Sequence, residues 1–381
     1  MNHPPEIKRS LCLHGPPVRH TPREMLMRLL ERMPPDTPGS GPLGPVAQLE
    51  ERVARLLGKE AALFFPTGTM AQQVALRIHA EQRGRSTFAA HPQCHLAVWE
   101  DNGYSVIHGL RFQPAGDPHA LLTLEDLSEV KIPLAALVLE LPQRDIGGQL
   151  PSWASLGEQV AWARERGAAV HMDGARLWEA QTFYERPFSD IAGLFDSVYV
   201  SLYKSLRGIR GAVLAGSKEL VAEASVWRMR LGGSIPDAWP LAAAALLGLD
   251  DVLPRMKGFR DYAITLAAAI NRDSGAHTLP EDPQTPLFHV HLPASKRAVE
   301  AAADAILAER GIQLFRRVLR SPDERSCRFE ITIGENAMDF TPDEVVSLLR
   351  ELLDRANAND RASRSHGKDA ASGCEPIDLR R

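Results

Sequence analysis

A lysine stands where proteins rarely place one. Lys204 follows SVYVSL, an apolar and partly β-branched run at 197–202, and Gly208 and Gly211 come soon after it. A surface lysine is the ordinary interpretation, but the apolar run before it and the glycine turn after it weaken that interpretation. A desolvated lysine has a lowered pKa and can act as an amine nucleophile that forms an imine with a carbonyl compound.

A carboxylate follows a second apolar run. Asp173 comes directly after AAVHM at 168–172, and Gly174 then breaks the pattern. The carboxylate could cap a helix, bind a metal ion or pair with a protonated ring nitrogen. Arg176 could bind an anion or pair with Asp173.

The stretch FFPTGTMAQ predicts an anion site. Its strand ends at Pro66, and Thr67, Gly68 and Thr69 open a helix. A helix N-terminus has unpaired N–H groups and a partial positive charge. Gly68 allows the backbone to approach a ligand closely, and both threonine hydroxyls can add hydrogen bonds. A plain threonine N-cap is the simpler alternative.

Two histidines lie in HPQCHLAVWEDNGY, at 91–104. His91 and His95 are four residues apart, but Pro92 argues against a helix across them and no third metal ligand is evident. We therefore expect no metal, and we expect His95 to stack on a ring or to transfer protons.

The order of these residues is more specific than any one of them. A phosphate-binding helix start, a histidine, a strand followed by aspartate and a strand followed by lysine are the parts needed to hold pyridoxal phosphate. Lys204 would hold its aldehyde, and Asp173 would keep its ring nitrogen protonated so that the ring can accept electrons.

The elements that position these residues alternate between strands and helices. Strands are predicted at 61–65, 134–141, 168–172, 197–202 and 211–216, and helices at 45–58, 69–83 and 154–167. Such alternation predicts an α/β fold with a mostly parallel sheet covered on both faces, whose ligands bind beyond the carboxyl ends of the strands. Later strands at 287–292 and 328–333 and helices at 296–311 and 342–356 predict a smaller α+β domain.

The chain of 381 residues suits two domains at about 100–200 residues each. We expect an N-terminal arm at 1–45, which lies on the body or on a partner subunit. A large domain is expected at 46–255 and a small C-terminal domain at 256–356. Residues 357–381 are polar and lack periodicity, so we expect a disordered tail.

The composition argues against several functional classes. The 44 basic and 48 acidic residues give a formal charge of −4, which does not favour nucleic acid as a partner. No apolar run approaches the roughly 18–20 residues that span a membrane, and the N-terminus lacks the apolar core of a signal peptide. The 4 cysteines are far apart, which favours neither a metal site nor a disulfide framework. A cytoplasmic protein is expected.

Taken together, the motifs resemble those of the threonine aldolase / aromatic amino acid β-eliminating lyase family, whose members are fold-type-I pyridoxal phosphate enzymes with an aspartate aminotransferase-like fold. The resemblance covers roughly residues 11–355 and rests on FFPTGTMAQ, HMDGARLWEA, SVYVSLYKSLRGIRGAVLAG and, more weakly, CHLAVWEDNGY. It implies that Lys204 binds the cofactor aldehyde, that Asp173 pairs with the pyridinium and that His95 stacks on the ring close to the substrate hydroxyl. It places Gly68 and Thr69 at the phosphate, where Thr67 is a further candidate.

The resemblance also implies two arginines for the substrate carboxylate. Arg176 would lie beside the cofactor and this carboxylate. Arg328, which opens RFEITI, matches the family arginine that clamps the carboxylate from the small domain. A surface arginine at a sheet edge is the alternative for Arg328.

The implied activity is cleavage of the Cα–Cβ bond of a β-hydroxy amino acid to glycine and an aldehyde. β-Elimination or another Cα reaction with the same cofactor remains an alternative, and a non-catalytic binding relative is less favoured. Because the family builds its sites between subunits, a homodimer or homotetramer is expected.

Several segments depart from the family pattern. The usual serine-aspartate-threonine run reads LHGPPVR, so Gly15, Pro16 and Pro17 supply no hydroxyl. The tyrosine-glycine-aspartate-aspartate segment reads DTPGSGPLG, ENTHN reads ELPQRDIGG, the glycine after the lysine is Ser205, and an MR pair is replaced by Ile235 and Pro236. We interpret the chain as a divergent subgroup whose substrate need not be threonine.

Overall fold

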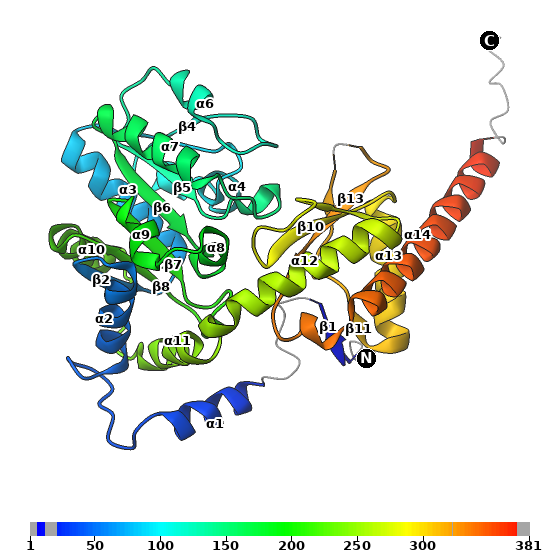
Figure 1. Cartoon of the computed structure of the whole chain (residues 1–381), viewed down its shortest axis with the longest axis horizontal. Coiled ribbons are helices and arrows are strands. Elements are labelled where there is room, and N and C mark those ends of the chain that lie inside the picture. The colour runs from blue at the N-terminus through cyan, green and yellow to red at the C-terminus, as the bar shows by residue number, and fades with distance from the viewer. Residues whose placement is uncertain (1–5, 12–20, 322, 372–381) are drawn as a thin grey trace, which may run out of the picture. The chain divides into compact units, whose positions relative to one another are not determined.

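The structure is a computed structural model that describes residues 6–11, 21–321 and 323–371 (Figure 1). The chain divides into two compact units. The large unit comprises Arg19–Ala263 and Pro283–Leu287, and the small unit comprises Met1–Val18, Ile264–Asp282 and Phe288–Arg381. The division falls inside the helix α12 (Met256–Asp273). The domain boundaries expected from the sequence remain a prediction.

A seven-stranded sheet forms the centre of the large unit. Its strand order is β2 (Ala61–Phe65), β8 (Ala212–Gly216), β7 (Ser197–Ser201), β6 (Ala169–Gly174), β5 (Ala136–Glu140), β3 (Thr87–Ala90) and β4 (Arg111–Pro114). Strand β8 is antiparallel to both of its neighbours, whereas β7, β6, β5, β3 and β4 pair in parallel. This arrangement confirms the predicted mostly parallel α/β sheet.

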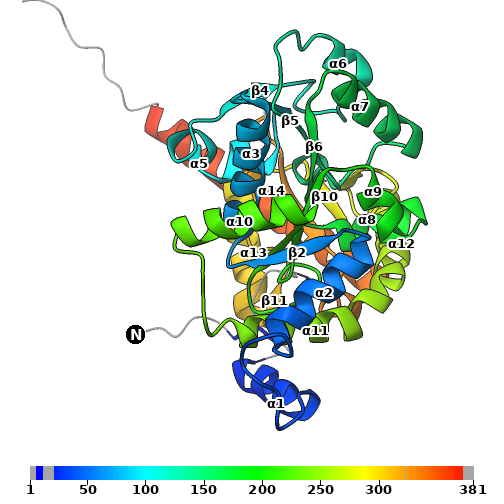
Figure 2. The ribbon, with the colours of Figure 1, turned by 90° about the vertical axis from the view of Figure 1, so that its left-hand side faces the viewer.

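Helices cover both faces of this sheet (Figure 2). One face carries α3 (Gly68–Arg83) and α10 (Lys218–Arg230), and the other carries α2 (Pro45–Leu57), α7 (Trp153–Glu165), α8 (Leu177–Tyr184) and α9 (Phe188–Gly193). Shorter elements of the large unit are α4 (His95–Trp99), α5 (Gly103–Val106), α6 (Leu124–Ser128), η1 (Arg144–Ile146) and η2 (Leu253–Arg255).

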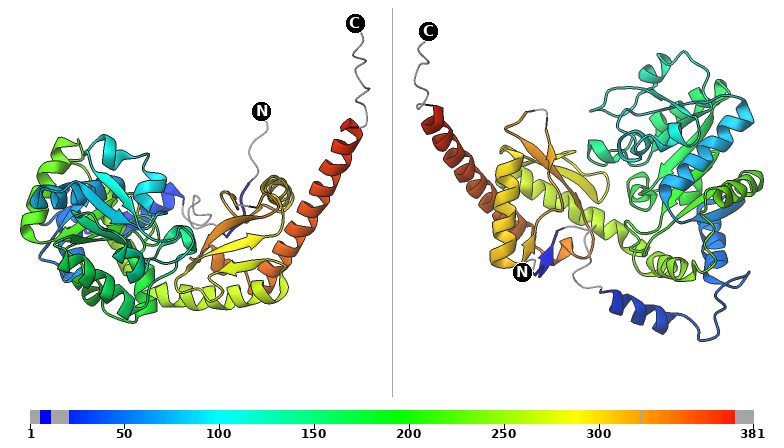
Figure 3. Two further views of the ribbon diagram at one scale, coloured as in Figure 1. Left: turned by 90° about the horizontal axis from the view of Figure 1, so that it is seen from above. Right: turned by 180° about the vertical axis from the view of Figure 1, so that it is seen from behind.

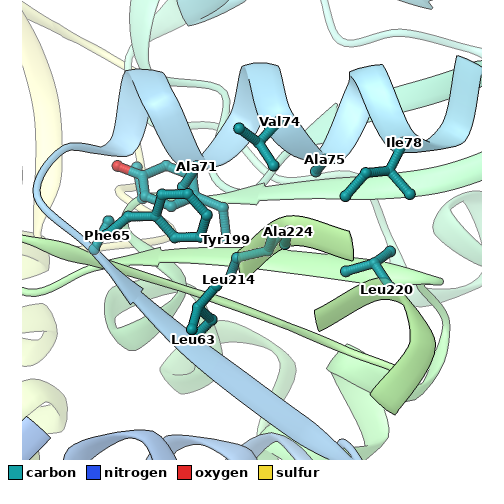
Figure 4. Packing of buried hydrophobic residues seen from close by; sticks show 12 residues of the cluster. Leu63, Phe65, Ala71, Val74, Ala75, Ile78, Tyr199, Leu214, Leu220 and Ala224 are labelled. Atoms are coloured by element: carbon teal, nitrogen blue, oxygen red, sulfur yellow. The ribbon is translucent and has the colours of Figure 1, made fainter. Parts of the chain in front are cut away.

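The core beneath α3 shows why the helix lies on the sheet. Ala71, Val74, Ala75 and Ile78 follow the spacing of one helix face, and all are buried. They pack against Tyr199 of β7 and against residues of β2, β8 and α10 (Figure 4). The burial of this stripe fixes the start of α3 near the end of β7.

Two strands of the large sheet, β3 and β4, were not predicted from the sequence. Each of β3 and β4 has 4 residues, and their sequences are TFAA and RFQP. Strand β4 lies at the sheet edge and has no fully buried residue, so it carries no apolar run to detect.

The predicted N-terminal arm contributes to both units. In the small unit, β1 (Arg9–Ser10) pairs with β11 (Ile312–Gln313). In the large unit, α1 (Pro22–Arg32) packs on α11 (Trp239–Asp251), where Leu29 is buried with Ala243 and Ala244. The predicted departure at Gly15, Pro16 and Pro17 lies outside the described residues.

A four-stranded sheet forms the small unit. Its order is β12 (Leu319–Arg320), β13 (Cys327–Thr332), β10 (Leu287–Leu292) and β9 (His277–Leu279). The helices α13 (Lys296–Arg310) and α14 (Pro342–Ala371) run beside each other next to it, and η3 (Ala337–Asp339) precedes α14 (Figure 3). The predicted α+β pattern is confirmed.

The expected disordered tail requires a correction at residues 357–371, whereas residues 372–381 lie outside the described residues. Helix α14 continues to Ala371, so residues 357–371 are helical in the structure. Alanine and arginine recur in this segment and have high helix propensity, which lets a helix that begins on an amphipathic stretch propagate. Among the described residues, no helix is long and apolar enough to cross a membrane.

Candidate active site

Three neighbouring parallel strands, β5, β6 and β7, have their carboxyl ends side by side. These strand ends form the sheet edge at which the candidate site lies. Glu140 at the end of β5 is the register partner of Asp173 in β6, and Asp173 is the partner of Tyr199 in β7. Register partners in a parallel sheet point to the same face. Lys204 follows the end of β7, so the lysine and two carboxylates converge at this edge.

Lys204 has the environment of a reactive amine. Burial lowers its pKa to about 8, and the positive charge of Arg176 acts in the same direction, whereas Asp173 and Glu140 oppose the shift. An unperturbed lysine has a pKa of about 10.4, so Lys204 becomes a neutral nucleophile at a lower pH.

The loop after Lys204 depends on a glycine. Gly211 has a φ of 112°, and a Cβ atom there would lie 2.5 Å from the ring of Phe64. Only glycine accepts both this conformation and this close approach. The backbone of the loop is therefore held tightly between Lys204 and β8.

Asp173 is 2% exposed. Its Oδ1 accepts a hydrogen bond of 3.0 Å from the Ala175 N–H, which holds the carboxylate at the turn after β6. The N-cap of the following helix α8 is Arg176, without a side-chain cap. The helix-cap alternative for Asp173 is therefore wrong.

The start of α3 supplies backbone donors. The hydroxyl of Thr67 accepts the Met70 N–H at 3.2 Å, and its carbonyl accepts the Ala71 N–H at 3.2 Å. The threonine N-cap is thus present. The N–H groups of Gly68 and Thr69 come earlier in the helix than those of Met70 and Ala71, and helix geometry gives them no carbonyl partner within the helix. An anion can bind to these two groups while Thr67 keeps its capping role.

Gly68 lies directly against Tyr199, whose ring sits under the first turn of α3 (Figure 4). A Cβ atom at Gly68 would lie 2.1 Å from the Tyr199 hydroxyl and 2.5 Å from its ring carbon. The glycine therefore sets how closely the helix start approaches the sheet edge that carries Asp173.

We expect Gly68→Ala to destabilise the protein, because the added methyl overlaps a buried ring. The expected loss of unfolding free energy is about 1–3 kcal/mol, measured by denaturant unfolding. Gly157→Ala in α7 is the matched control, since a Cβ atom there meets nothing within 4 Å. That control should be neutral or stabilising by about 0.5–1 kcal/mol. An equally stable Gly68→Ala protein would contradict the close packing.

His95 begins α4 and is held by a buried carboxylate. Its Nδ1 lies 3.1 Å from Oε1 of Glu100, whose other oxygen accepts from Nε2 of Gln73 at 2.9 Å. A carboxylate oxygen accepts, so Nδ1 carries the hydrogen, and in the neutral ring Nε2 is then the acceptor. This arrangement is that of an oriented proton acceptor.

The structure does not give His91 such a role. Its Nε2 contacts the Ala120 carbonyl at 2.8 Å and its Nδ1 accepts the Gln93 N–H at 3.1 Å. Both ring nitrogens are therefore engaged by the backbone. No group of three His, Cys, Asp or Glu side chains in the described part of the chain could hold a metal ion.

Arg176 is 3% exposed and lies beside another buried carboxylate. Its Nε is 3.6 Å from Oε1 of Glu179. The hydroxyl of Ser205 also donates to this oxygen, which ties the segment next to Lys204 to α8. Where typical family members have glycine, this chain has Ser205, whose side chain donates a hydrogen bond to Glu179.

Besides Glu100, two carboxylates of this site, Glu140 and Glu179, were not assigned a role from the sequence. Glu140 directly follows the apolar run of β5, so the reasoning that selected Asp173 could have selected it too. Glu179 carries no such signal, because its position depends on the packing of α8 against the loop after β7.

Arg328 lies in the small unit, on β13 opposite Leu319 of β12. Its charge contributes to a lowered pKa of His291, although burial is the main cause. Its Nε is shielded from solvent and has no hydrogen-bond partner among the described residues. The residue as a whole is half-buried, so the clamp and the surface-arginine alternative both stay predictions.

The residues of the large unit fit pyridoxal phosphate. The start of α3 offers backbone donors for a phosphate, and Gly68 keeps that position free of a side chain. Lys204 offers an amine with a lowered pKa, and Asp173 offers a buried carboxylate on the neighbouring strand. This donor set suits a phosphate, an aldehyde and a ring nitrogen in one ligand.

Comparison with known proteins identifies the family. The sequence model described as Beta-eliminating lyase matches residues 27–293. Low-specificity L-threonine aldolase 1 of Arabidopsis thaliana is 29% identical over 71% of this chain and 78% of its own length. The low specificity L-threonine aldolase of Escherichia coli strain K12 is 29% identical over 62% of this chain and 72% of its own length.

Solved structures agree with these sequence relatives. A Listeria monocytogenes EGD-E protein, provisionally assigned as an L-allo-threonine aldolase, superposes with a TM-score of 0.84 at 33% identity, over 92% of this chain and 97% of that one. The predicted fold class and family are both confirmed. The chain belongs to the beta-eliminating lyase family.

Proposed function

We propose that the protein is a pyridoxal phosphate-dependent lyase that cleaves the Cα–Cβ bond of a β-hydroxy amino acid to an aldehyde and glycine. The observation that carries this proposal is the position of Lys204, an amine with a lowered pKa, beside Asp173 at one sheet edge. The names of the sequence relatives, which are threonine aldolases, support this reaction.

The large unit supplies the groups that would hold the cofactor. The backbone at Gly68 and Thr69, with the Thr67 hydroxyl, would bind the phosphate. Lys204 would bind the aldehyde, Asp173 the ring nitrogen and His95 the ring face. When bound, the cofactor supplies an aromatic ring that accepts the electrons left on the substrate Cα.

The remaining chemistry belongs to side chains of the chain. His95 is proposed to accept the β-hydroxyl proton at Nε2, because Glu100 holds its other ring nitrogen. Arg176 is proposed to orient the substrate carboxylate, with its own orientation fixed by Glu179. Lys204, with its lowered pKa, can return a proton to Cα as an ammonium or act as an amine near neutral pH.

A segment that departs from the family pattern has a defined structure. ELPQRDIGG contains η1. There Oδ2 of Asp145 accepts the Trp99 indole N–H at 2.6 Å, and Arg144 lies over the Trp99 ring at 5.6 Å. Trp99 lies on the same helix as His95. The contacts of Arg144 and Asp145, which belong to the departing segment, support a substrate side different from that of typical members, so the substrate need not be threonine.

The reaction is tested by a screen of β-hydroxy amino acids with the purified, cofactor-loaded protein. Release of an aldehyde together with glycine is expected. A keto acid and ammonia would instead indicate β-elimination, which is the second candidate. A protein without the visible absorbance of a lysine-bound cofactor would favour a non-catalytic binding role.

Arg328 is proposed to bind the substrate carboxylate. We expect Arg328→Ala to raise KM by roughly 10- to 100-fold, because a charge-assisted hydrogen bond contributes about 1.5–3 kcal/mol. Steady-state kinetics with the best substrate of the screen measures this change. Arg325→Ala, at an exposed position on the same segment, should leave KM unchanged. An unchanged KM in Arg328→Ala would remove the proposed clamp.

A homodimer or homotetramer is also proposed. The exposed apolar side chains Leu26 and Leu30 of α1, at 58% and 74% exposure, support burial of this helix in an assembly. Light scattering coupled to gel filtration measures the mass.

The cytoplasm remains the expected compartment, in keeping with the buried free thiols of Cys94 and Cys327.

A further inference from the structure

Residues 140–146 hold the short helix α4 at both of its ends. At the start of α4, Oε2 of Glu140 accepts the His95 N–H at 3.1 Å. At its end, Oδ2 of Asp145 accepts the Trp99 indole N–H at 2.6 Å. One segment of the chain therefore contacts the first and the last residue of the helix that carries His95.

A helix as short as α4 needs such contacts. It has 5 residues, and its N-cap Cys94 makes no side-chain cap bond. Isolated helices shorter than about 12–15 residues are marginally stable in water. The position of α4, and of the His95 ring on it, is therefore set by the segments that it contacts.

The segment that holds α4 is itself well anchored. Gln143 is buried, and its N–H donates to the Gln149 carbonyl at 2.9 Å. Its Nε2 donates at 3.0 Å to the carbonyl of Gln93, which lies just before α4. The Arg144 N–H donates to Oε1 of Glu140 at 3.2 Å, so the segment bonds back to the strand from which it starts. These bonds favour one position of the segment, which makes it a fixed support.

The support begins on the strand pair that also positions Asp173. Glu140 in β5 is the register partner of Asp173 in β6. Asp173 is proposed to hold the cofactor ring nitrogen, and His95 is proposed to lie on the ring face. One pair of neighbouring strand ends thus fixes both groups, Asp173 directly and His95 through α4.

We propose that Glu140 and Asp145 are positioning residues that act through α4. They hold the helix from its two ends and so fix where His95 presents Nε2. The segment ELPQRDIGG, which departs from the family pattern, thereby acts on the site through the histidine that it positions. This inference rests on the proposed function for the role of His95, whereas the hold on α4 is measured without turnover.

The hold on α4 is tested by hydrogen exchange of the full-length protein, read by mass spectrometry of a peptide that spans α4. Asp145→Ala removes the acceptor of the Trp99 indole N–H. Exchange in this peptide should become about five- to tenfold faster, because the loss of the bond lowers the free energy of local opening. Asp145→Asn keeps a side-chain oxygen for the indole and should restore slow exchange. Unchanged exchange in Asp145→Ala would overturn the proposal.

Glu81→Ala is the matched control. Oε2 of Glu81 accepts the Trp227 indole N–H at 3.3 Å, so this change removes the same kind of bond from another part of the large unit. Exchange in the α4 peptide should stay slow. Equal acceleration in Glu81→Ala and Asp145→Ala would show a general loss of packing and would also count against the proposal.

Trp99→Phe removes the same bond from the other side. The phenyl ring keeps an aromatic face for Arg144 but has no N–H for Asp145, so exchange in α4 should again be about five- to tenfold faster. This variant decides the question if Asp145→Ala fails to fold. Slow exchange in Trp99→Phe would contradict a hold through the indole.

Glu140→Gln tests the start of the helix. Glutamine has one acceptor oxygen where glutamate has two, so the N–H groups of His95 and Arg144 cannot both keep their partner. Exchange in the α4 peptide should rise by about five- to tenfold here too. The role of Glu140 would be wrong if the exchange rate did not change.

Turnover tests whether the hold acts through His95. Asp145→Ala should lower kcat by roughly 10- to 100-fold and change KM by less than about threefold, because a displaced proton acceptor slows the chemical step more than it weakens binding. In a His95→Ala background, the same change should lower kcat by less than about twofold, since residues that act through one group are not additive. A full loss in that background would overturn the action through His95.

The two proposals can fail separately. Absence of aldehyde release in the substrate screen would count against the proposed function and would leave the exchange rates of α4 unaffected. Normal aldehyde release with unchanged exchange in the variants would overturn only the positioning roles of Glu140 and Asp145.

Discussion

Lys204→Ala is expected to abolish turnover, with a loss of roughly 10⁴-fold or more in kcat, because it removes the only group proposed to hold the cofactor covalently. The visible absorbance of the lysine-bound cofactor should disappear with it. Borohydride reduction followed by peptide mapping should label position 204 in the unmodified protein and should leave that position unlabelled in the variant.

Lys59 provides a matched control for this experiment. It lies in the same unit, burial also lowers its pKa, and its Nζ donates to the Phe195 carbonyl at 2.5 Å. Lys59→Ala removes a partly buried lysine without touching the strand ends, so turnover and absorbance should persist. Normal activity in Lys204→Ala would remove the central assignment, whatever the control does.

Asp173→Asn is expected to lower turnover by several orders of magnitude, roughly 10³-fold or more, while part of the cofactor binding persists. Asparagine keeps an oxygen for the Ala175 N–H, so the turn after β6 should survive. The amide has no negative charge to keep a ring nitrogen protonated, and this is the function that should be lost. Aldehyde release and visible absorbance on the same sample measure the two effects.

Asp196→Asn separates this loss from a general effect of charge. Oδ2 of Asp196 accepts the Val170 N–H at 2.7 Å, so it supports β6 near its beginning, away from the strand end that carries Asp173. Turnover should be largely retained in this variant. If Asp173→Asn turned over at the normal rate, the role of the carboxylate in maintaining ring charge would be wrong.

Much of the large sheet could be predicted because its signals are local. The strands β2, β5, β6, β7 and β8 are short apolar runs, and each was found within a few residues. Strand β4 could not be found in this way, because an exposed edge strand needs no apolar pattern. Helix α14 was predicted too short, because a polar composition alone does not end a helix.

The candidate site was predictable in part for the same reason. Parallel strands bring their carboxyl ends to one edge, so a residue that follows a strand is placed near the site by topology alone. Lys204, Asp173 and the start of α3 all satisfied that condition. Glu100 lies in the same sequence motif as His95. Its hydrogen bonds to the His95 ring and to Gln73, however, depend on tertiary packing.

The sequence by itself therefore determined which side chains can do chemistry and which strand or helix end carries each of them. Only the tertiary structure decided that Glu140 and Asp173 are neighbours, that Tyr199 leaves no room for a Cβ atom at Gly68, and that Glu179 contacts both Arg176 and Ser205. The physical reason is one of range. Residue type and periodicity act over a few positions of the chain, whereas proton affinity and close packing depend on distances and burial between segments far apart in sequence.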